Sequence, residues 1–379
     1  MRRAPLGLLA VPLIALTACG GGTAVTATRP TATSATNGPI AVTAGDASCA
    51  LARTALTAGP HVFAIRNAGS DVTEVYVYGA KDVIAAEVEN LGPGLTRELT
   101  VELAAGTYQV ACKPGLKGAG IRTAVTVTAA GSAAPVDPRL TAGVAAYTAY
   151  VQAEVAKLLV VTQEFTTAVE AGDVAKAKAR YAASRIPWER IEPVTGSFGD
   201  LDPRLDAREA DLQPGQSWTG WHRLEKDLWV KGSVAGDAPI AQQLMADLRL
   251  LQVRVAAVVL TPSQLGNGAK ELLDEVATGK VTGVEEKYSH TDLVDFAANV
   301  EGAKQAYTAL RPVLLSKDPA LAAKLDGEFT DVETGLAAYG SGATYRSYTA
   351  LSKQQIRRLA ESVDALSEPL SRLTAAVVG

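Results

Sequence analysis

Residues 129–170 read AAGSAAPVD and then PRLTAGVAAYTAYVQAEVAKLLVVTQEFTTAVE, and the character of the chain changes within this stretch. The first part is made of small residues and proline, which is typical of a linker between two domains. Residues 140–170 instead follow the period of one long helix, which Gly172 and Asp173 end. We therefore expect a domain boundary here, with a different kind of secondary structure on each side.

The chain after the linker consists of helical patterns. Asp202 followed by Pro203 has the form of an N-cap with proline at the first helical position. No internal repeat with a period of about 20 to 50 residues is visible, which argues against a solenoid. The pattern predicts that residues 137–379 form an all-α bundle. Further helical stretches are expected at residues 174–184, 219–230, 239–260, 270–278, 292–315, 319–338 and 348–377.

Before the linker, residues 40–130 favour a small β-sandwich of six or seven strands. Val62 and Ala64, and likewise Val75 and Val77, alternate with more polar neighbours, as in half-buried strands. Turn residues such as Gly59-Pro60 separate the runs. The strands are expected at residues 40–43, 61–66, 73–78, 99–103, 108–111 and 122–128.

The N-terminal segment predicts export and a lipid anchor. Arg2 and Arg3 precede an apolar stretch at residues 6–16 that is too short to span a bilayer. Residues 16–19 read LTAC and resemble the lipobox of bacterial lipoproteins, in which the cysteine, here Cys19, becomes lipidated after cleavage. We expect a signal peptide at 1–19, a flexible tether at 20–39, and a protein anchored to the outer face of the cell membrane. An ordinary secretory signal is the alternative.

Length and composition agree with two globular domains. A chain of 379 residues is longer than one compact core usually extends. Hydrophobic residues make up 47% and charged residues 20%, which provides enough apolar material for buried cores. The formal net charge of -4 argues against a nucleic-acid partner, because such a partner selects a basic face. A modest acidic excess suits the handling of cations, although many soluble proteins share it.

Two cysteines, Cys49 and Cys112, lie in the β domain and leave two interpretations open. In an exported protein they can form a disulfide. They can instead bind a metal together with carboxylates, for which Glu74, Glu87 and Glu89 are the candidates. A blue-copper site needs two histidines, a cysteine and usually a methionine, whereas this domain has only His61 and no methionine. Standard copper electron transfer is therefore not expected.

Residues 218–229, WTGWHRLEKDLW, carry the sharpest chemical signal. On a helix, His222 and Glu225 are three residues apart and project from one face toward one point. Trp229 lies on the same face, which places the pair at the inner edge of an apolar stripe. A buried imidazole and carboxylate must be satisfied, either by each other as a structural pair or by a bound ion.

Other side chains could complete a metal site around that pair. Each has a simpler alternative. Acidic faces are usually solvated, and His290 suits a capping loop. Glu154 lies in a mostly apolar stretch, where an unpaired carboxylate that faces inward would be costly, but it could instead be solvated beside Lys157. One or two imidazoles with several carboxylates favour hard or borderline cations such as iron, manganese or calcium. The candidate ligands around His222 and Glu225 are Glu154, Glu189, Glu192, Asp206 and His290.

Three segments resemble the EfeO family of extracytoplasmic iron-uptake components: residues 185–193 (RIPWERIEP), 220–229 (GWHRLEKDLW) and 287–292 (KYSHTD). The β domain is similar to the cupredoxin-like N-terminal domain of that family, and the helical part is similar to its imelysin-like domain. The resemblance covers nearly all of residues 40–379. It implies a cupredoxin-like β-sandwich followed by an all-α imelysin-like bundle.

The resemblance also implies a function. The implied function has two steps. Iron, as Fe²⁺ or Fe³⁺, is captured at a site that includes the His-x-x-Glu pair, and the iron is then delivered to an EfeU-type permease. An EfeB-type haem peroxidase is the implied third component. The residues Cys49, Cys112, Glu74 and Glu87 or Glu89 match the metal positions proposed for the β domain, where copper or a second iron would bind.

Two other classes of function stay open. The imelysin name carries a peptidase label, but a zincin uses His-Glu-x-x-His, and the His222 segment has no second histidine. No Gly-x-Ser-x-Gly nucleophile elbow is present either, so we expect a binding protein rather than an enzyme. A cation-dependent binder of anionic polysaccharide is the second alternative.

Overall fold

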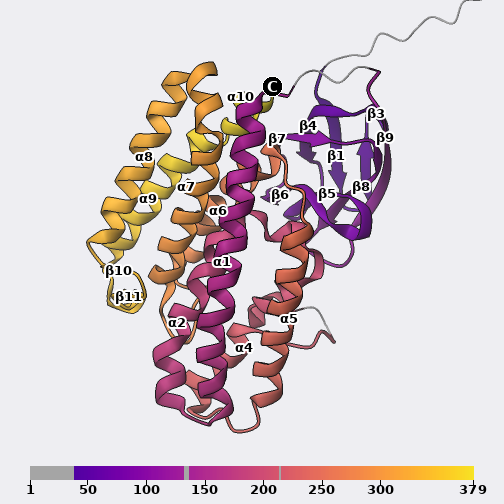
Figure 1. Ribbon diagram of the computed structural model, residues 1–379. Helices are drawn as coiled ribbons and strands as arrows, with labels where there is room; N and C mark the ends of the chain where they lie inside the picture. Colours follow the sequence, from indigo (N-terminus) through magenta and orange to yellow (C-terminus); the bar gives the residue numbers. More distant parts are fainter. Residues whose placement is uncertain (1–37, 132–135, 213–214) are drawn as a thin grey trace, which may run out of the picture. The chain divides into compact units, whose positions relative to one another are not determined.

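The computed structural model describes residues 38–131, 136–212 and 215–379, so the predicted signal peptide, Cys19 and the tether up to residue 37 lie outside the described residues. Strands make up the N-terminal part and helices the C-terminal part (Figure 1). This confirms the predicted order of a β domain and a helical domain. Gly38–Gly379 form one unit, in which the two domains are in contact.

Two sheets form the β domain, with the strand orders β2-β1-β4-β7 and β3-β9-β8-β5-β6. The described residues 38–131 hold nine strands, more than the six or seven expected. The eight-residue strand β6 was missed because its sequence, IAAEVENL, is rich in alanine and glutamate, which favour helices. The strands are β1 (Ile40–Gly45), β2 (Ser48–Leu51), β3 (Ala55–Thr57), β4 (Gly59–Asn67), β5 (Thr73–Tyr78), β6 (Ile84–Leu91), β7 (Thr96–Leu103), β8 (Gly106–Pro114) and β9 (Ile121–Thr128).

The core of the β domain lies between the two sheets. Successive side chains of a strand point to opposite faces, so one residue settles the orientation of its neighbours. In β4 the expected orientation is wrong, because Phe63 and Ile65 are buried in the core whereas Val62 and Ala64 are only partly buried. The bulkier apolar side chains take the core face, which buries more apolar surface.

The helical domain is built mainly from long helices. The starts of these helices follow local capping rules. The side chains of Asp137 and Asp173 accept hydrogen bonds from backbone N–H groups at the starts of two helices, and Thr261 forms a capping box with Gln264 at the start of a third. The helices are α1 (Pro138–Glu170), α2 (Val174–Ile191), α3 (Asp202–Leu205), α4 (Trp221–Lys226), α5 (Ala238–Ala257), α6 (Pro262–Thr278), α7 (Asp292–Lys317), α8 (Pro319–Ala337), α9 (Lys353–Leu370) and α10 (Leu373–Val378).

Short 3-10 and π segments and one small hairpin join these helices. Two of them, at residues 227–231 and 280–282, lie beside the candidate site. The segments are η1 (Ala80–Asp82) in the β domain and, in the helical domain, η2 (Glu192–Leu201), η3 (Glu209–Asp211), η4 (Asp227–Lys231), η5 (Lys280–Thr282), η6 (Tyr348–Ala350), β10 (Gly340–Ser341) and β11 (Thr344–Tyr345).

Close helix packing brings the site-bearing elements together. Helix α1 is long and apolar enough to cross a membrane by composition, yet it packs along α2, α5 and α7. Helices α2 and α7 approach so closely that a Cβ added at Gly302 would lie 2.3 Å from the backbone oxygen of Arg190. The domains meet at α6, where Asn267 donates to the Thr100 oxygen at 2.8 Å and Ser263 Oγ accepts from the Glu102 N–H at 3.1 Å.

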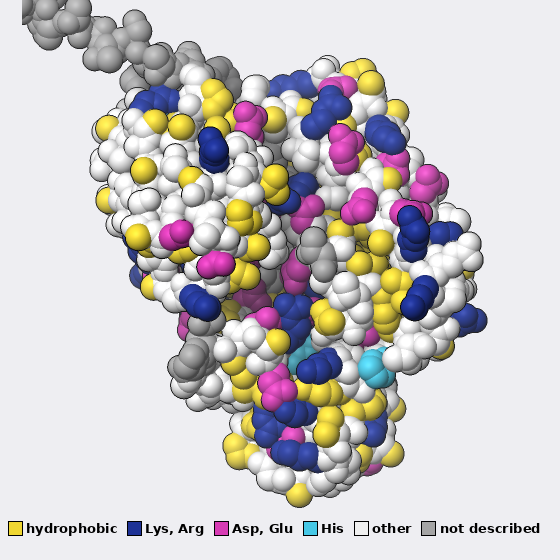
Figure 2. Space-filling model, turned by 180° about the vertical axis from the view of Figure 1, so that it is seen from behind, with side chains coloured by type: hydrophobic (Ala, Val, Ile, Leu, Met, Phe, Trp, Pro, Cys, Tyr) yellow, Lys and Arg dark blue, Asp and Glu magenta, His cyan; other side chains and the backbone are white. Residues whose placement is uncertain are grey.

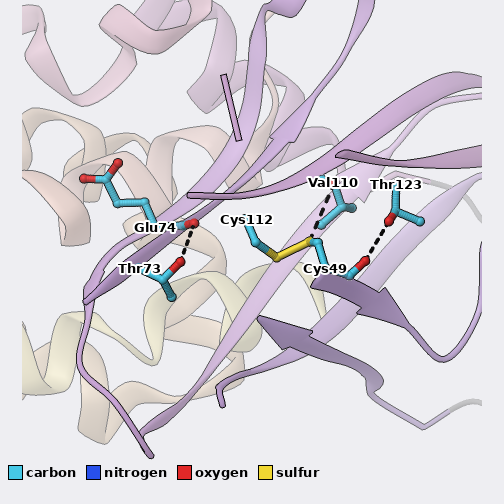
Figure 3. The surroundings of a disulfide bond; sticks show 6 residues. All are labelled: Cys49, Thr73, Glu74, Val110, Cys112 and Thr123. Carbon is cyan, nitrogen blue, oxygen red and sulfur yellow. Dashed lines mark hydrogen bonds between the residues drawn. A yellow bond between two sulfur atoms is a disulfide. The ribbon is translucent and has the colours of Figure 1, made fainter. Parts of the chain in front are cut away.

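Cys49 and Cys112 form a disulfide inside the β domain (Figure 3). Both side chains are buried, and Cys112 pairs with Val75 across β8 and β5. Since side chains alternate, Glu74 beside Val75 takes the other face of the sheet, and Figure 3 shows its carboxylate directed away from the sulfurs. Of the two interpretations of the cysteines, the structure shows the disulfide.

Removal of this disulfide should destabilise the β domain. The double variant Cys49→Ser/Cys112→Ser frees two chain segments 63 residues apart, so we expect the free energy of unfolding to fall by about 2–4 kcal/mol. Denaturant unfolding of the parent and the variant measures the difference, with thiol titration of the parent before and after reduction as the control. In a protein of residues 20–379, which lacks Cys19, thiols that react in the unreduced, unfolded parent would contradict the disulfide.

Candidate metal centre

His222 and Glu225 lie on α4 as the helical spacing predicts, and both are buried. His222 Nδ1 is 3.3 Å from Glu225 Oε2. The other Glu225 oxygen accepts the backbone N–H groups of Tyr288 and Ser289 at 2.8 and 2.7 Å. Gly220 is the N-cap of this short helix; its φ is 84°, and a Cβ there would lie 2.0 Å from the backbone oxygen of Leu205. The absence of a side chain at Gly220 thus lets α4 begin directly against the end of α3.

Carboxylates from other segments surround the imidazole. His222 Nε2 lies 3.4 Å from Asp206 Oδ1 and 3.7 Å from Glu285 Oε1. Glu286 Oε1 is 4.0 Å from the other ring nitrogen. Potential ligand atoms lie within 4.8 Å of one another in two overlapping groups, and His222 belongs to both. We call the five residues that make up these groups the His222 cluster: Asp206, His222, Glu225, Glu285 and Glu286.

Arg185 is the resident cation beside this cluster. Its guanidinium is fully buried, and Nε lies 2.7 Å from Glu286 Oε1 and 3.4 Å from Asp295 Oδ2. It also forms ion pairs with Glu189 and Asp206. Trp188 supports the same carboxylate, because its indole N–H donates to Asp206 Oδ2 at 2.7 Å. These contacts fix the positions of carboxylates that would otherwise repel one another.

The acid groups nevertheless outnumber the basic ones. Burial raises the pKa of Glu286, and the nearby Glu225 carboxylate raises it further, well above its ordinary value. Burial acts on Glu285 as well, but Lys280 and His222 outweigh it and hold the pKa of Glu285 well below its usual range. One carboxyl of the cluster thus retains a proton more readily than its neighbour does. A cation could replace that proton.

The imidazole is held in its protonated form. Burial lowers the pKa of His222 and Arg185 lowers it too, but Glu225, Glu285 and Asp206 together raise it to about 9. At neutral pH the ring therefore carries a proton that a metal ion must displace before a ring nitrogen can become a ligand. The cluster combines one nitrogen with oxygen donors, a donor set that suits hard or borderline cations.

Three of the predicted acidic ligands lie at or near the cluster. Asp206 lies beside the imidazole. Glu189 is one contact away, since its carboxylate pairs with Arg185 and lies 3.0 Å from Lys280 Nζ. Glu192 is further out and pairs with the same ammonium at 2.9 Å.

The structure does not bring Glu154 or the imidazole of His290 into the His222 cluster. Glu154 is buried as its apolar surroundings suggested, but its oxygens pair with Lys157 at 2.5 Å and Arg190 at 3.5 Å. His290 contributes through its backbone, donating to the Glu286 oxygen at 2.8 Å and accepting from the Tyr348 N–H at 3.0 Å. Its φ of 60° fits a capping loop. The simpler alternative therefore holds for His290, whereas Glu154 is buried and paired with basic side chains rather than solvated.

Sequence reasoning missed Glu285 and Glu286 as members of the His222 cluster. Both are buried and lie in the segment between η5 and α7. The signal in the sequence is their position directly before residues 287–292, one of the three segments that resemble the EfeO family. Two adjacent acidic residues in a loop usually face solvent, so the pattern alone does not distinguish them.

The acidic candidates of the β domain are separated from the cysteines. Glu87 pairs with Tyr76 across β6 and β5, on the face opposite the disulfide, and Tyr76 donates to Glu74 at 2.9 Å. Glu87 and Glu89 instead line a cavity between the β domain and the helical domain. The five residues proposed for a second metal site therefore do not form one cluster.

Comparisons with known proteins agree on one family. Residues 143–373 match the imelysin family model, Peptidase M75. The chain is 38% identical over 339 residues to the iron uptake system component EfeO of Escherichia coli K12, which is 88% of this chain and 90% of that protein. EfeO proteins of Shigella flexneri and Shigella sonnei match with the same identity and coverage.

The fold is also similar to that of solved structures, of which one is a protein of Parabacteroides distasonis described as an iron-regulated protein A precursor, with a TM-score of 0.53 and 16% identity. The match covers 65% of this chain and 97% of the other. At this identity the likeness concerns the fold alone.

Cation binding at the His222 cluster should release protons and become tighter as pH rises. Since the pKa of His222 is about 9, its proton competes with the metal throughout the range from pH 6 to pH 9, and competition weakens toward the upper end. We expect the affinity for Mn²⁺ to rise by up to about tenfold per pH unit. Calorimetric titration in buffers of different ionisation enthalpy counts the released protons. An affinity that does not change between pH 6.5 and 8.5 would contradict this assignment.

Proposed function

Because this chain belongs to the imelysin family, and within it to the EfeO iron-uptake components, we propose that it captures iron at the His222 cluster and delivers it to a membrane permease. The observation that carries the proposal is the buried excess of carboxylates around one imidazole. An excess of negative charge in a buried place requires protons or a cation. Iron accepts oxygen ligands with an imidazole when no thiolate is nearby.

The residues of the cluster have distinct roles in this proposal. His222, Asp206 and Glu285 offer one group of donors, and Glu225 with Glu286 offers a second around the same ring. The backbone N–H groups that hold Glu225 fix one of its oxygens and leave the other directed to His222. Fixed donors of this kind reduce the ordering cost of binding an ion.

We propose a binding protein rather than a peptidase. A hydrolytic metal centre needs an open position for water and access for a peptide substrate. Every residue of the His222 cluster except Asp206 is buried, and the Asp206 side chain is only 7% exposed. Such a site suits an ion more than a polypeptide. The His222 segment also departs from the two-histidine pattern of zincins.

The proposed setting is the outer face of the cell membrane. The relatives are named as components of an iron uptake system, which supports an extracytoplasmic role alongside other components. An EfeU-type permease as the acceptor and an EfeB-type haem peroxidase as a further component are part of this proposal. The anchor would be a lipid on Cys19, a residue outside the described ranges.

Replacement of either central ligand should weaken iron binding. For residues 20–379 we expect His222→Ala and Glu225→Ala each to lower the affinity at least about tenfold, which is about 1.4 kcal/mol, because each removes a donor. Anaerobic calorimetric titration with Fe²⁺, repeated with Fe³⁺ supplied as citrate, measures the effect and shows which oxidation state binds.

Glu154→Gln is the matched control, because it neutralises a buried carboxylate of the same domain that pairs with Lys157 and Arg190. It should bind iron within about twofold of the parent. If both alanine variants bind as tightly as the parent, the site is elsewhere, and His222 with Glu225 is an internal hydrogen-bonded pair.

Lipid anchoring at Cys19 makes a separate prediction. Cys19→Ala removes the thiol that would carry the lipid, so the protein should move from the membrane fraction to the soluble extracytoplasmic fraction. Immunoblotting of fractionated cells detects the change. A parent protein that is already soluble would show that it has no anchor.

A further inference from the structure

The His222 cluster is enclosed, so an ion must reach it past other side chains. His222, Glu225 and Glu286 are each at most 1% exposed, and Glu285 is 4% exposed. Iron carried by water has a hydration shell, which it must lose on the way in. The structure should therefore contain a place where the ion begins to exchange water for protein oxygens.

A cavity between the two domains comes close to the cluster. Its volume is about 1210 Å³, and Figure 2 shows acidic side chains gathered in the hollow between the β domain and the helical domain. We call it the interdomain cavity. Its acidic lining comes from both domains and includes Glu87, Glu89, Glu192, Asp202, Glu271 and Glu275. Two further acidic residues of the lining, Asp82 and Asp200, pair with arginines.

Lys280 lies between this cavity and the His222 cluster. Its side chain is fully buried, and Nζ is 2.9 Å from Glu192, which lines the cavity. On the other side, Nζ is 3.8 Å from Glu285 Oε1, the same oxygen that lies 3.7 Å from His222 Nε2. Glu189, paired with Arg185, completes the surroundings of the ammonium at 3.0 Å. One lysine thus contacts a carboxylate of the cavity and a carboxylate of the cluster.

We propose that Lys280 controls the passage of iron between the interdomain cavity and the His222 cluster, an inference that rests on the proposed function. The ammonium neutralises Glu192 and Glu285 while no iron is present, and it repels an incoming cation. It must move aside as the ion passes from one carboxylate to the other. Lys280 is therefore a positioning residue that sets the rate of loading, without being a ligand.

Arg208 offers the competing route and the matched control. Its NH1 lies 2.9 Å from Glu285 Oε2, so it is a second cation on the same carboxylate. Its side chain is 28% exposed, whereas that of Lys280 is fully buried, and it does not line the interdomain cavity. Loss of either positive charge should attract iron to Glu285. Only the loss of Lys280 should also open the way from the cavity.

Loading can be followed by stopped-flow tryptophan fluorescence. Trp188 donates to Asp206 and Trp221 lies on α4 beside His222, so bound Fe²⁺ should quench their emission. With residues 20–379 and Fe²⁺ under anaerobic conditions, we expect Lys280→Met to load at least about tenfold faster than the parent. Lys280→Arg, which keeps the charge, should stay within about threefold, and Arg208→Met should accelerate loading less than Lys280→Met.

Removal of one member of a buried ion pair can prevent folding, so a second variant is needed. Lys280→Met/Glu189→Gln removes the ammonium together with a buried carboxylate that pairs with it, which is better tolerated. It keeps Glu192 and Glu285, the two carboxylates of the route, and should also load faster than the parent. If Lys280→Met folds and loads iron at the parent rate, the inference is overturned. If Lys280→Met does not fold, loading of the double variant at the parent rate overturns it. Equal or greater acceleration by Arg208→Met would place the route on the Arg208 side and overturn it too.

The proposed function is judged separately by the parent and by His222→Ala. If the parent binds iron and His222→Ala does not, the function stands whatever Lys280 does. If iron changes neither the tryptophan fluorescence of the parent nor its calorimetric titration, the proposed function fails, and the role of Lys280 fails with it.

Discussion

The buried guanidinium of Arg185 is the interaction on which the helical domain depends. It pairs with Glu189 in α2, with Asp206 after α3, with Glu286 in the loop before α7, and with Asp295 in α7. Carboxylates of this density cannot be removed from water without compensation, because each unpaired buried charge costs several kcal/mol. The planar, always charged guanidinium provides that compensation in a fixed geometry. It thereby fixes where separate segments of the chain meet, and the imidazole of His222 lies beside their meeting point.

Positive charge from the chain does not balance the His222 cluster completely, and this imbalance bears on the proposed binding of an ion. Burial and Glu225 raise the pKa of Glu286 well above its ordinary value, while Glu225, Glu285 and Asp206 raise the pKa of His222 to about 9, so both groups hold protons more readily than they would in water. An ion that binds must displace such protons, so part of its binding free energy is spent on releasing them. Affinity is lowered to the same extent. A carrier that must give up its ion benefits from this moderation, whereas a structural metal site does not.

In the β domain, the alternation of side chains along a strand places the disulfide and the carboxylates on opposite faces of one sheet. Val75 and Cys112 are paired residues on the core side, where the disulfide closes the domain. Tyr76 and Glu87 are paired residues on the opposite side, which faces the helical domain across the interdomain cavity. The sulfur chemistry is therefore buried inside one domain, and the carboxylates are exposed to the space between the two. A single alternation of side chains produces both arrangements.

The sequence by itself determined what depends on near neighbours: the change from strands to helices at the linker, and the projection of His222 and Glu225 from one helical face. For Glu154 the sequence left a buried and a solvated position open, and the structure shows it buried and paired with Lys157 and Arg190. Only the tertiary structure decided which distant carboxylates join His222. Glu285 and Glu286 lie some sixty residues further along the chain, and they arrive there because two backbone N–H groups of the following residues donate to Glu225. Contacts of that kind depend on how packed helices place a loop, and local spacing carries no information about that placement.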